Sequence, residues 1–584
     1  MIVGTFVQRP LADTPTPTAP ANGNGANGHT HPNGAGHGDG AGGRTAPPPP
    51  APPAGPATPD PGSPPAPPVV TGAERLAQLR ALRRRAVDGP AGSTERQHAR
   101  GKLTARERIE LLLDPGTFVE LDMFAVHRAV GFGLEDDHPL TDGVVTGWGT
   151  VDGRTIAVYA HDFRIFGGAL GEVHATKIHK VQDLAASIGC PLVGLNDGVG
   201  ARIQEGVSAL DGYGGIFVRN ARSSGVVPQV SVMLGPCAGG AVYSPALTDF
   251  VFAVRGVSNM FITGPDVVRK VTGEVVGKDD LGGADVHATR SGVAHVVTDD
   301  EESCIEDVRY LLSFLPSNNH ELPPTVTPTD DPERRCDGLL AMLPDRPSEA
   351  YDVRRIVAEI VDDGELFELQ EQFARSVVCA FARLDGQVVG IVANQPSVLA
   401  GVLDIDSSEK AARFVRTCDA FNVPLVTLVD VPGFLPGVAQ EHNGIIRHGA
   451  KLLFAYCEAT VPRVQLVLRK AYGGAYIVMD SKGIGADLSF AWPTNEVAVM
   501  GAEPAADIVF RKEITAAADP EATRRRLVGA YQDRLAGPFV AAERGMVDDV
   551  IDPADTRRIL VRSLRMLRSK QESLPQRKHG NVPL

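Results

Sequence analysis

The chain carries the same short pattern twice, with the two copies about 233 residues apart. In the first copy, an apolar run that begins Pro-Leu-Val ends at Asp197, and a Gly-Gly-Ala triplet follows at 239–241. In the second copy, a run with the same beginning ends at Asp430, and the triplet returns at 473–475. A repeat of this length is too long for a solenoid and is typical of a duplicated α/β domain. We therefore predict two related α/β halves.

Each Gly-Gly-Ala triplet follows an apolar run and precedes a helix-like segment, which predicts a strand-to-helix turn. Glycine has no Cβ, so a ligand can approach the backbone closely, and the first N–H groups of a helix have no intrahelical acceptor. The helix dipole also favours a negative oxygen at this end. A single turn of this kind is explained equally well by tight packing. Its duplication at the same spacing favours function, so we predict two oxyanion sites in one enzyme.

The composition changes sharply near residue 71 and again between residues 316 and 346. The first stretch is rich in Pro, Gly and Ala and has too little apolar bulk to offset the entropy of ordering it. The second contains several prolines together with paired Asn and Asp residues, a pattern typical of a linker. We predict a disordered tail at 1–71, an N-terminal domain at 72–325 and a C-terminal domain at 326–584.

Hydrophobic periodicity predicts alternating strands and helices in both halves, as in βαβ units. Thr104 and Glu107 have the spacing of a capping box at the start of one helix. Helices are predicted at 73–87, 105–113, 172–187, 351–361 and 555–570, and strands at 143–149, 155–160, 191–195, 229–234, 388–394, 425–429, 464–468 and 496–500.

The overall composition excludes several classes of protein. The net charge of −14 argues against a nucleic-acid partner. No apolar stretch reaches the eighteen or so residues that span a bilayer, and the first residues do not form a secretory signal. The seven cysteines include no Cys-x-x-Cys pair, so we predict neither a zinc site nor any other metal centre. A soluble cytoplasmic protein without a membrane partner is expected.

Side chains that could act as acid or base are few. Asp197 and Asp430 end strands and could be catalytic, although an aspartate that anchors the following loop through hydrogen bonds is the more common situation. Glu441 and His442 lie in a predicted solvated loop. Neither glycine turn has the spacing of a P-loop or a dinucleotide fold, and no G-x-S-x-G or H-E-x-x-H motif occurs. Two backbone oxyanion sites without a side-chain base indicate a base carried by the substrate or a cofactor.

Taken together, several motifs resemble the carboxyltransferase (β) subunit of biotin-dependent acyl-CoA carboxylases, and most of all the propionyl-CoA and acetyl-CoA carboxylase β chains of actinobacteria. The resemblance extends from about residue 72 to the C-terminus. The motifs that carry it are the stretch 197–206, Gly-Pro-Cys-Ala-Gly-Gly-Ala-Val-Tyr at 235–243, Val-Leu-Asp-Ile-Asp at 402–406, Val-Pro-Gly-Phe at 431–434, Gly-Gly-Ala-Tyr at 473–476 and Arg-Lys-His-Gly-Asn at 577–581.

The resemblance implies an α/β fold of two tandem crotonase-like domains, each a superhelix of ββα units, in a homohexamer built as a dimer of trimers. It implies that the two halves of each site come from different subunits and that CO2 passes from carboxybiotin to the α-carbon of an acyl-CoA. No Met is followed by Lys, so the chain has no biotin acceptor and needs a biotinylated α subunit as partner. The need for a small ε subunit stays open.

The family's roles are carried over to matching positions of this sequence. Gly239 and Gly240 would hold the thioester enolate, and Gly474 and Ala475 the ureido oxygen of biotin. The acyl-CoA contacts implied are Gly167, Gly168, Ala201, Arg202, Tyr213, Ala238, Tyr476 and Ile477, and the biotin contacts are Pro432, Gly433, Phe434 and Gly473.

One departure from the family concerns acyl specificity. Propionyl-selective members carry Asp where this chain has Ile477, and an apolar residue there is associated with acetyl or broader acyl acceptance. The alternative is that Ile477 only packs in the core. Three rival functions stay open: the carboxyltransferase subunit of a biotin-dependent decarboxylase, a 3-methylcrotonyl-CoA-type β subunit, and a catalytically silent assembly subunit.

Overall fold

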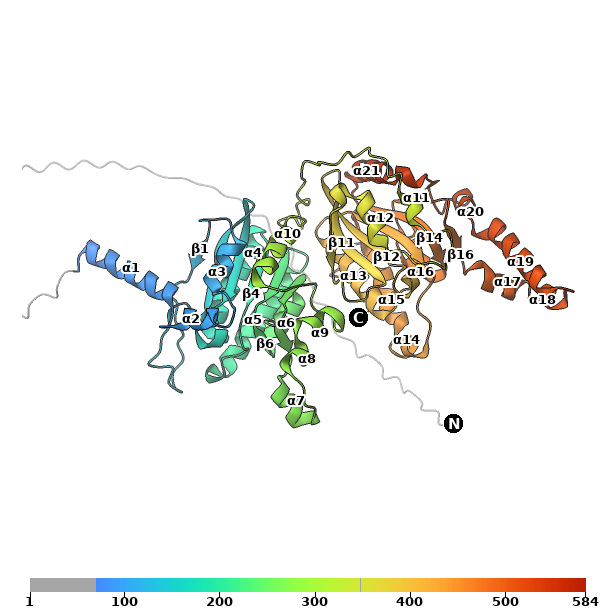
Figure 1. The fold of residues 1–584 in the computed structure, drawn as a ribbon. Helices are drawn as coiled ribbons and strands as arrows, with labels where there is room; N and C mark the ends of the chain where they lie inside the picture. The colour runs from blue at the N-terminus through green and yellow to red at the C-terminus, as the bar shows by residue number, and fades with distance from the viewer. Residues whose placement is uncertain (1–69, 347, 584) are drawn as a thin grey trace, which may run out of the picture. The chain divides into compact units, whose positions relative to one another are not determined.

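The computed structural model describes residues 70–346 and 348–583, which belong to one compact unit that begins at Val70 (Figure 1). The tail predicted for residues 1–71 lies outside the described residues apart from its last two. Within the described part of the chain, no helix is both long enough and apolar enough to cross a membrane.

The first half is built on a seven-stranded sheet with the order β1-β2-β3-β4-β5-β7-β9. The pairs β1–β2 and β2–β3 are antiparallel, and every later pair is parallel. A short parallel pair, β6 with β8, lies beside this sheet. The strands are β1 (Val119–Leu121), β2 (Val144–Val151), β3 (Arg154–His161), β4 (Leu192–Asn196), β5 (Gln229–Met233), β6 (Pro236–Ala238), β7 (Phe250–Val254), β8 (Asn259–Phe261) and β9 (Val296–Thr298).

The second half repeats this design in the order β10-β11-β12-β13-β14-β15-β17, again with two antiparallel pairs followed by parallel ones. Here β14 is long enough to serve as β5 and β6 at once, and its end pairs with β16. The strands are β10 (Leu366–Leu369), β11 (Val377–Leu384), β12 (Gln387–Asn394), β13 (Leu425–Val431), β14 (Arg463–Tyr472), β15 (Leu488–Ala491), β16 (Glu496–Ala498) and β17 (Asp549–Val550).

Helices connect the parallel strands, and the capping box predicted at Thr104 and Glu107 is confirmed. The predicted helices are present with ends shifted by up to three residues. In order they are α1 (Gly72–Asp88), α2 (Ser93–His98), α3 (Ala105–Leu112), α4 (Glu172–Ile188), α5 (Val207–Ser223), α6 (Gly240–Leu247), α7 (Pro265–Thr272), α8 (Lys278–Gly282), α9 (Ala284–Thr289), α10 (Glu301–Leu312), α11 (Leu339–Met342), α12 (Val353–Ile360), α13 (Ile405–Ala420), α14 (Val438–His442), α15 (Ile445–Glu458), α16 (Gly473–Val478), α17 (Ala502–Val509), α18 (Arg511–Ala516), α19 (Pro520–Tyr531), α20 (Pro538–Glu543) and α21 (Thr556–Leu567).

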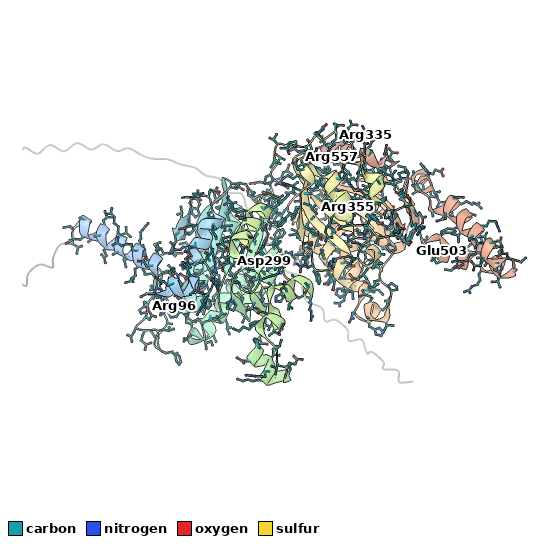
Figure 2. The ribbon with its side chains drawn as sticks, viewed as in Figure 1. Arg96, Asp299, Arg335, Arg355, Glu503 and Arg557 are labelled. Carbon is teal, nitrogen blue, oxygen red and sulfur yellow. The ribbon has the colours of Figure 1, made fainter. Side chains whose placement is uncertain are left out.

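A buried arginine fixes the last helix, α21, to the second half. Arg557 is 0% exposed; its guanidinium donates to Asp362 Oδ1 at 2.6 Å, to the Ile360 carbonyl at 2.8 Å and to the Asp331 carbonyl at 3.0 Å (Figure 2). The last of these acceptors lies in the predicted linker. Because a buried guanidinium needs all of these partners, α21 and the linker are held in one arrangement.

The aspartates that end β4 and β13 are buried anchors. Asp197 accepts hydrogen bonds from Lys102 Nζ at 2.6 Å and from Arg108 at 2.9 Å, and Arg108 also donates twice to Glu301 at 2.7 Å. Asp430 accepts from Tyr351 Oη and Arg469 Nε, both at 2.9 Å. Carboxylates with every lone pair occupied in this way fix the strand-end loops and are poor candidates for an acid or base.

This anchor gives a stability prediction. We expect Arg108→Met to lower the free energy of unfolding of the first half by about 3–5 kcal/mol, because two buried carboxylates lose their guanidinium. Urea unfolding can be followed by the fluorescence of Trp148 in a Trp492→Phe background, since these are the chain's 2 tryptophans. The control is Arg269→Met, which breaks an exposed pair with Asp266 and should cost less than about 1 kcal/mol. Equal losses for the two variants would contradict the anchor.

Candidate functional site

The first glycine turn joins β6 to α6. Gly239 has φ 60° and ψ −125°, a conformation that side chains resist, and its N–H donates to the carbonyls of Phe261 and Ile262, both at 3.2 Å. Gly240 is the first residue of α6, so its N–H has no intrahelical acceptor, and no other acceptor lies within hydrogen-bond distance among the described residues. Gly239 therefore shapes the turn, and the free donors begin at Gly240.

Gly240 is glycine for lack of room. A Cβ at this position would lie 2.9 Å from ring atoms of Tyr213, a buried side chain of α5. Burial raises the pKa of Tyr213, which keeps the phenol neutral. The carbonyl of Ala238, just before the turn, would lie 2.9 Å from a Cβ at Gly200. The structure thus brings Ala238, Gly239, Gly240 and Tyr213 together at one turn.

The second glycine turn joins β14 to α16 and is more open. Gly473 has φ 59°, and a Cβ there would come within 3.0 Å of the Val499 carbonyl. A Cβ at Gly474 would meet no atom within 4 Å. Gly474 and Ala475 lie in the first turn of α16, and neither N–H has an acceptor among the residues that the structure describes. Both N–H groups are available to a ligand.

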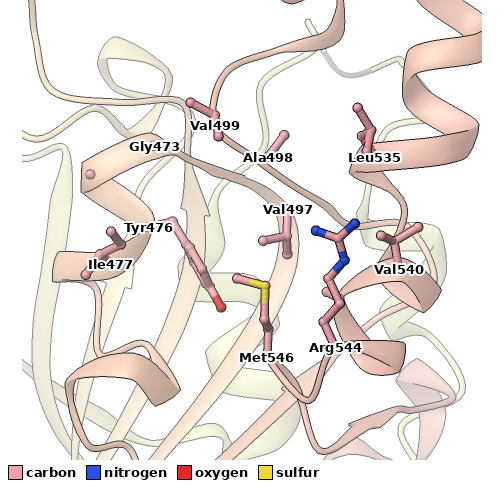
Figure 3. Close-up of a pocket in the computed structure, with 12 residues that line it drawn as sticks. Gly473, Tyr476, Ile477, Val497, Ala498, Val499, Leu535, Val540, Arg544 and Met546 are labelled. Carbon is pink, nitrogen blue, oxygen red and sulfur yellow. The ribbon is translucent and has the colours of Figure 1, made fainter.

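A cavity of about 430 Å³ lies beside the second turn (Figure 3). Tyr476 lies on its wall with 5% of its surface exposed; its hydroxyl has no hydrogen-bond partner among the described residues, and burial raises its pKa to about 12. Ile477 also lines the cavity and is 46% exposed, so it does not pack in the core. The lining is completed by Gly473, Gly474, Val497, Ala498, Val499, Leu535, Val540, Ala541, Arg544 and Met546.

Loops of matching conformation precede α4 and α13. Residues 166–168 and 399–401 form short 3-10 turns in which every residue has a positive φ, with the two copies 233 residues apart. The predicted acyl-CoA contacts Gly167 and Gly168 lie in the first of these turns. A Cβ at Gly168 would lie 2.1 Å from the Asp197 carbonyl, so only glycine lets this loop pack on the strand end.

The same repeat links two residues that were predicted to bind different ligands. Ala201 forms an isolated parallel bridge with Leu170, and Phe434 forms one with Leu403. Each pair is separated from its copy by 233 residues, so Ala201 and Phe434 are equivalent positions. The sequence analysis missed this equivalence, although the shared spacing in the sequence would have revealed it.

The predicted biotin contacts form the loop after β13. Gly433 accepts a hydrogen bond from the Leu403 N–H at 3.1 Å, and the Phe434 ring would lie 3.0 Å from a Cβ at Gly449 of α15. Pro432 and Phe434 are both half-buried. The loop is therefore fixed on both sides while it keeps an accessible face.

The structure corrects the prediction that Arg202 contacts the substrate. This side chain is 2% exposed; it pairs with Asp142 at 2.6 Å and with Glu205 at 2.7 Å and donates to the Ala169 carbonyl at 3.0 Å. Its guanidinium also lies 4.5 Å from the centre of the Phe166 ring. With its donors engaged inside the protein, Arg202 supports the loop from below.

Comparisons with known proteins agree with this geometry. The model of the carboxyl transferase domain family matches residues 96–582. The chain is 58% identical to the propionyl-CoA carboxylase carboxyltransferase subunit of Haloferax mediterranei, over 88% of this chain and 100% of that protein. It is 55% identical to the methylmalonyl-CoA decarboxylase subunit alpha of Propionigenium modestum, over 85% of this chain and 96% of that protein.

A solved structure extends the comparison. The crystal structure of the transcarboxylase 12S hexamer, with methylmalonyl-coenzyme A and methylmalonic acid bound, matches with a TM-score of 0.87 and 50% identity, over 88% of this chain and 99% of that one. Matches of this extent cover both sheets and both glycine turns. The chain therefore belongs to the carboxyl transferase family and is a carboxyltransferase of the propionyl-CoA carboxylase and transcarboxylase type.

Proposed function

We propose that the chain transfers CO2 from carboxybiotin, carried on a separate biotinylated α subunit, to the α-carbon of a short- or medium-chain acyl-CoA. The observation that carries this proposal is the pair of glycine turns, each with N–H donors free for a ligand oxygen. Loss of the α-proton from a thioester places negative charge on its oxygen. Preorganised N–H groups stabilise such charge more than they stabilise the neutral ground state.

The two turns take different roles in this proposal. The N–H of Gly240 and the dipole of α6 stabilise the thioester enolate, while Gly239 holds the turn in shape. The N–H groups of Gly474 and Ala475 hold the ureido oxygen of biotin, and Phe434 offers an apolar surface for its rings. These residues fit the group, because Gly474 faces open space and the neighbouring wall is apolar. Biotin, when bound, would supply the CO2 and the base.

We also propose the assembly that the resemblance implies. In both halves a helical segment follows the short strand beside the turn, and it exposes apolar side chains, among them Val271 at 78%, Ile508 at 66% and Phe539 at 63%. Such surface favours burial against further copies of the chain. We propose a cytoplasmic homohexamer of two crotonase-like domains per chain, 72–325 and 326–584, in which each site takes one turn from each of two copies.

The direct test is ATP-dependent fixation of labelled bicarbonate by the purified chain with its biotinylated α subunit, using acetyl- to octanoyl-CoA as acceptors. Fixation supports the proposed direction. The second candidate is decarboxylation, which the 55% identity to a methylmalonyl-CoA decarboxylase subunit favours. Loss of CO2 from methylmalonyl-CoA to biotin, without ATP-dependent fixation on any acceptor, would replace the first proposal with the second.

Gly474 allows an N–H donor to be removed with a matched control. We expect Gly474→Pro to lower kcat by about 10²–10³-fold, because proline has no N–H and is tolerated in the first turn of a helix. Gly474→Ala keeps the N–H, and its Cβ meets no atom within 4 Å, so we expect it to stay within about tenfold of the parent. Steady-state kinetics with a saturating carrier measure both variants, and equal losses would show that the N–H is not a donor in catalysis.

Position 477 tests the acyl preference. We expect Ile477→Asp to reduce kcat/KM for butyryl-CoA relative to propionyl-CoA by about tenfold or more, because a carboxylate in an apolar wall disfavours a longer alkyl chain. Ile477→Leu keeps the wall apolar and serves as the control. The measurement is competition between the two thioesters in one reaction. An unchanged product ratio for Ile477→Asp would remove Ile477 from the determinants of specificity.

A further inference from the structure

We infer that the cavity beside Gly474 holds the acyl chain of the substrate beyond its α-carbon, and that Val497, Val540 and Met546 limit the chain length. This inference rests on the proposed function. It assigns a location to the part of the substrate that does not react, which neither glycine turn accounts for.

The first argument is the geometry that the reaction requires. Reacting atoms must approach to about 3–3.5 Å, so the α-carbon has to come close to whatever the N–H groups of Gly474 and Ala475 hold. The carbons beyond the α-carbon then need space next to this turn. Gly474 faces such space, since a Cβ there would meet no atom within 4 Å, and the same residue lines the cavity.

The second argument is the nature of the walls. The cavity is bounded by β16, by the π-helical segment Gln532–Ala536 and by α20 with the turn that follows it. Its apolar lining is poorly covered, with Val499 at 77% exposed, Leu535 at 47% and Met546 at 39%. An alkyl chain would remove this surface from water, which is favourable in proportion to the area covered.

The third argument is size. The volume of about 430 Å³ lies within the range of pockets that bind small molecules. It corresponds to the liquid volume of roughly a dozen water molecules, which is room for a chain of several carbons. A propionyl group alone would leave most of this space unfilled.

The polar groups of the cavity are compatible with an uncharged chain. Tyr476 is neutral, and no carboxylate is among the residues that line the cavity. Arg544 has no ion pair or hydrogen bond among the described residues, and in Figure 3 its side chain lies along the wall between Val540 and Met546. Its methylene stem can cover an alkyl chain while the guanidinium stays in water.

The test fills the cavity. Val540→Trp places a large side chain in the space, and we expect it to weaken octanoyl-CoA binding at least tenfold while leaving acetyl-CoA binding within threefold. The control is Val509→Trp, the same substitution on α17 at a side chain that is 63% exposed and does not line the cavity. The assembled protein is used throughout, with its oligomeric state checked for each variant.

Binding is measured by calorimetry for acetyl-, butyryl-, hexanoyl- and octanoyl-CoA, so the cavity is tested without turnover. We expect the affinity of the parent to rise about fourfold per methylene beyond propionyl until the space is full. Equal effects of Val540→Trp on acetyl-CoA and octanoyl-CoA, or an effect that Val509→Trp reproduces, would overturn the inference. Intact chain-length-dependent binding without transfer to any acceptor would instead count against the proposed function.

Discussion

Both candidate sites depend on a backbone N–H that the fold leaves without an internal acceptor. A helix always begins with such groups, but they serve a ligand only where the chain enters the helix through a turn that exposes them. Gly239 and Gly473 provide that turn with φ values of 60° and 59°. The sheet then fixes the turn, because Asp197 and Asp430 hold the neighbouring strand ends through buried ion pairs and hydrogen bonds.

Duplication gave the two turns one geometry, and their surroundings differ. At Gly240 the space in front of the backbone is filled by Tyr213, so a substrate oxygen is admitted along one direction only. At Gly474 the backbone faces a cavity with an apolar wall. One ancestral element is thus adapted to two ligands by the residues around it, since the donors themselves carry no side chain that could differ.

Much of this could be predicted from the sequence, because the information was local or repeated. The helices and strands follow from periodicity, and the glycine turns follow from their duplicated spacing. The partners of Asp197 could not be found in this way, since Lys102, Arg108 and Glu301 are about 90 to 105 residues away along the chain. The fold brings them together, and an arginine such as Arg202 looks the same in sequence whether it is exposed to substrate or buried.

The central claim is that one turn from each half acts in the same reaction, contributed by different copies of the chain. The direct measurement is complementation between Gly240→Pro and Gly474→Pro chains, each inactive alone, after co-assembly in equal amounts. If the claim holds, mixed pairs contain one intact site, and about a quarter of the parent activity returns. If each chain works with its own two turns, mixing restores nothing, and that result would contradict the account.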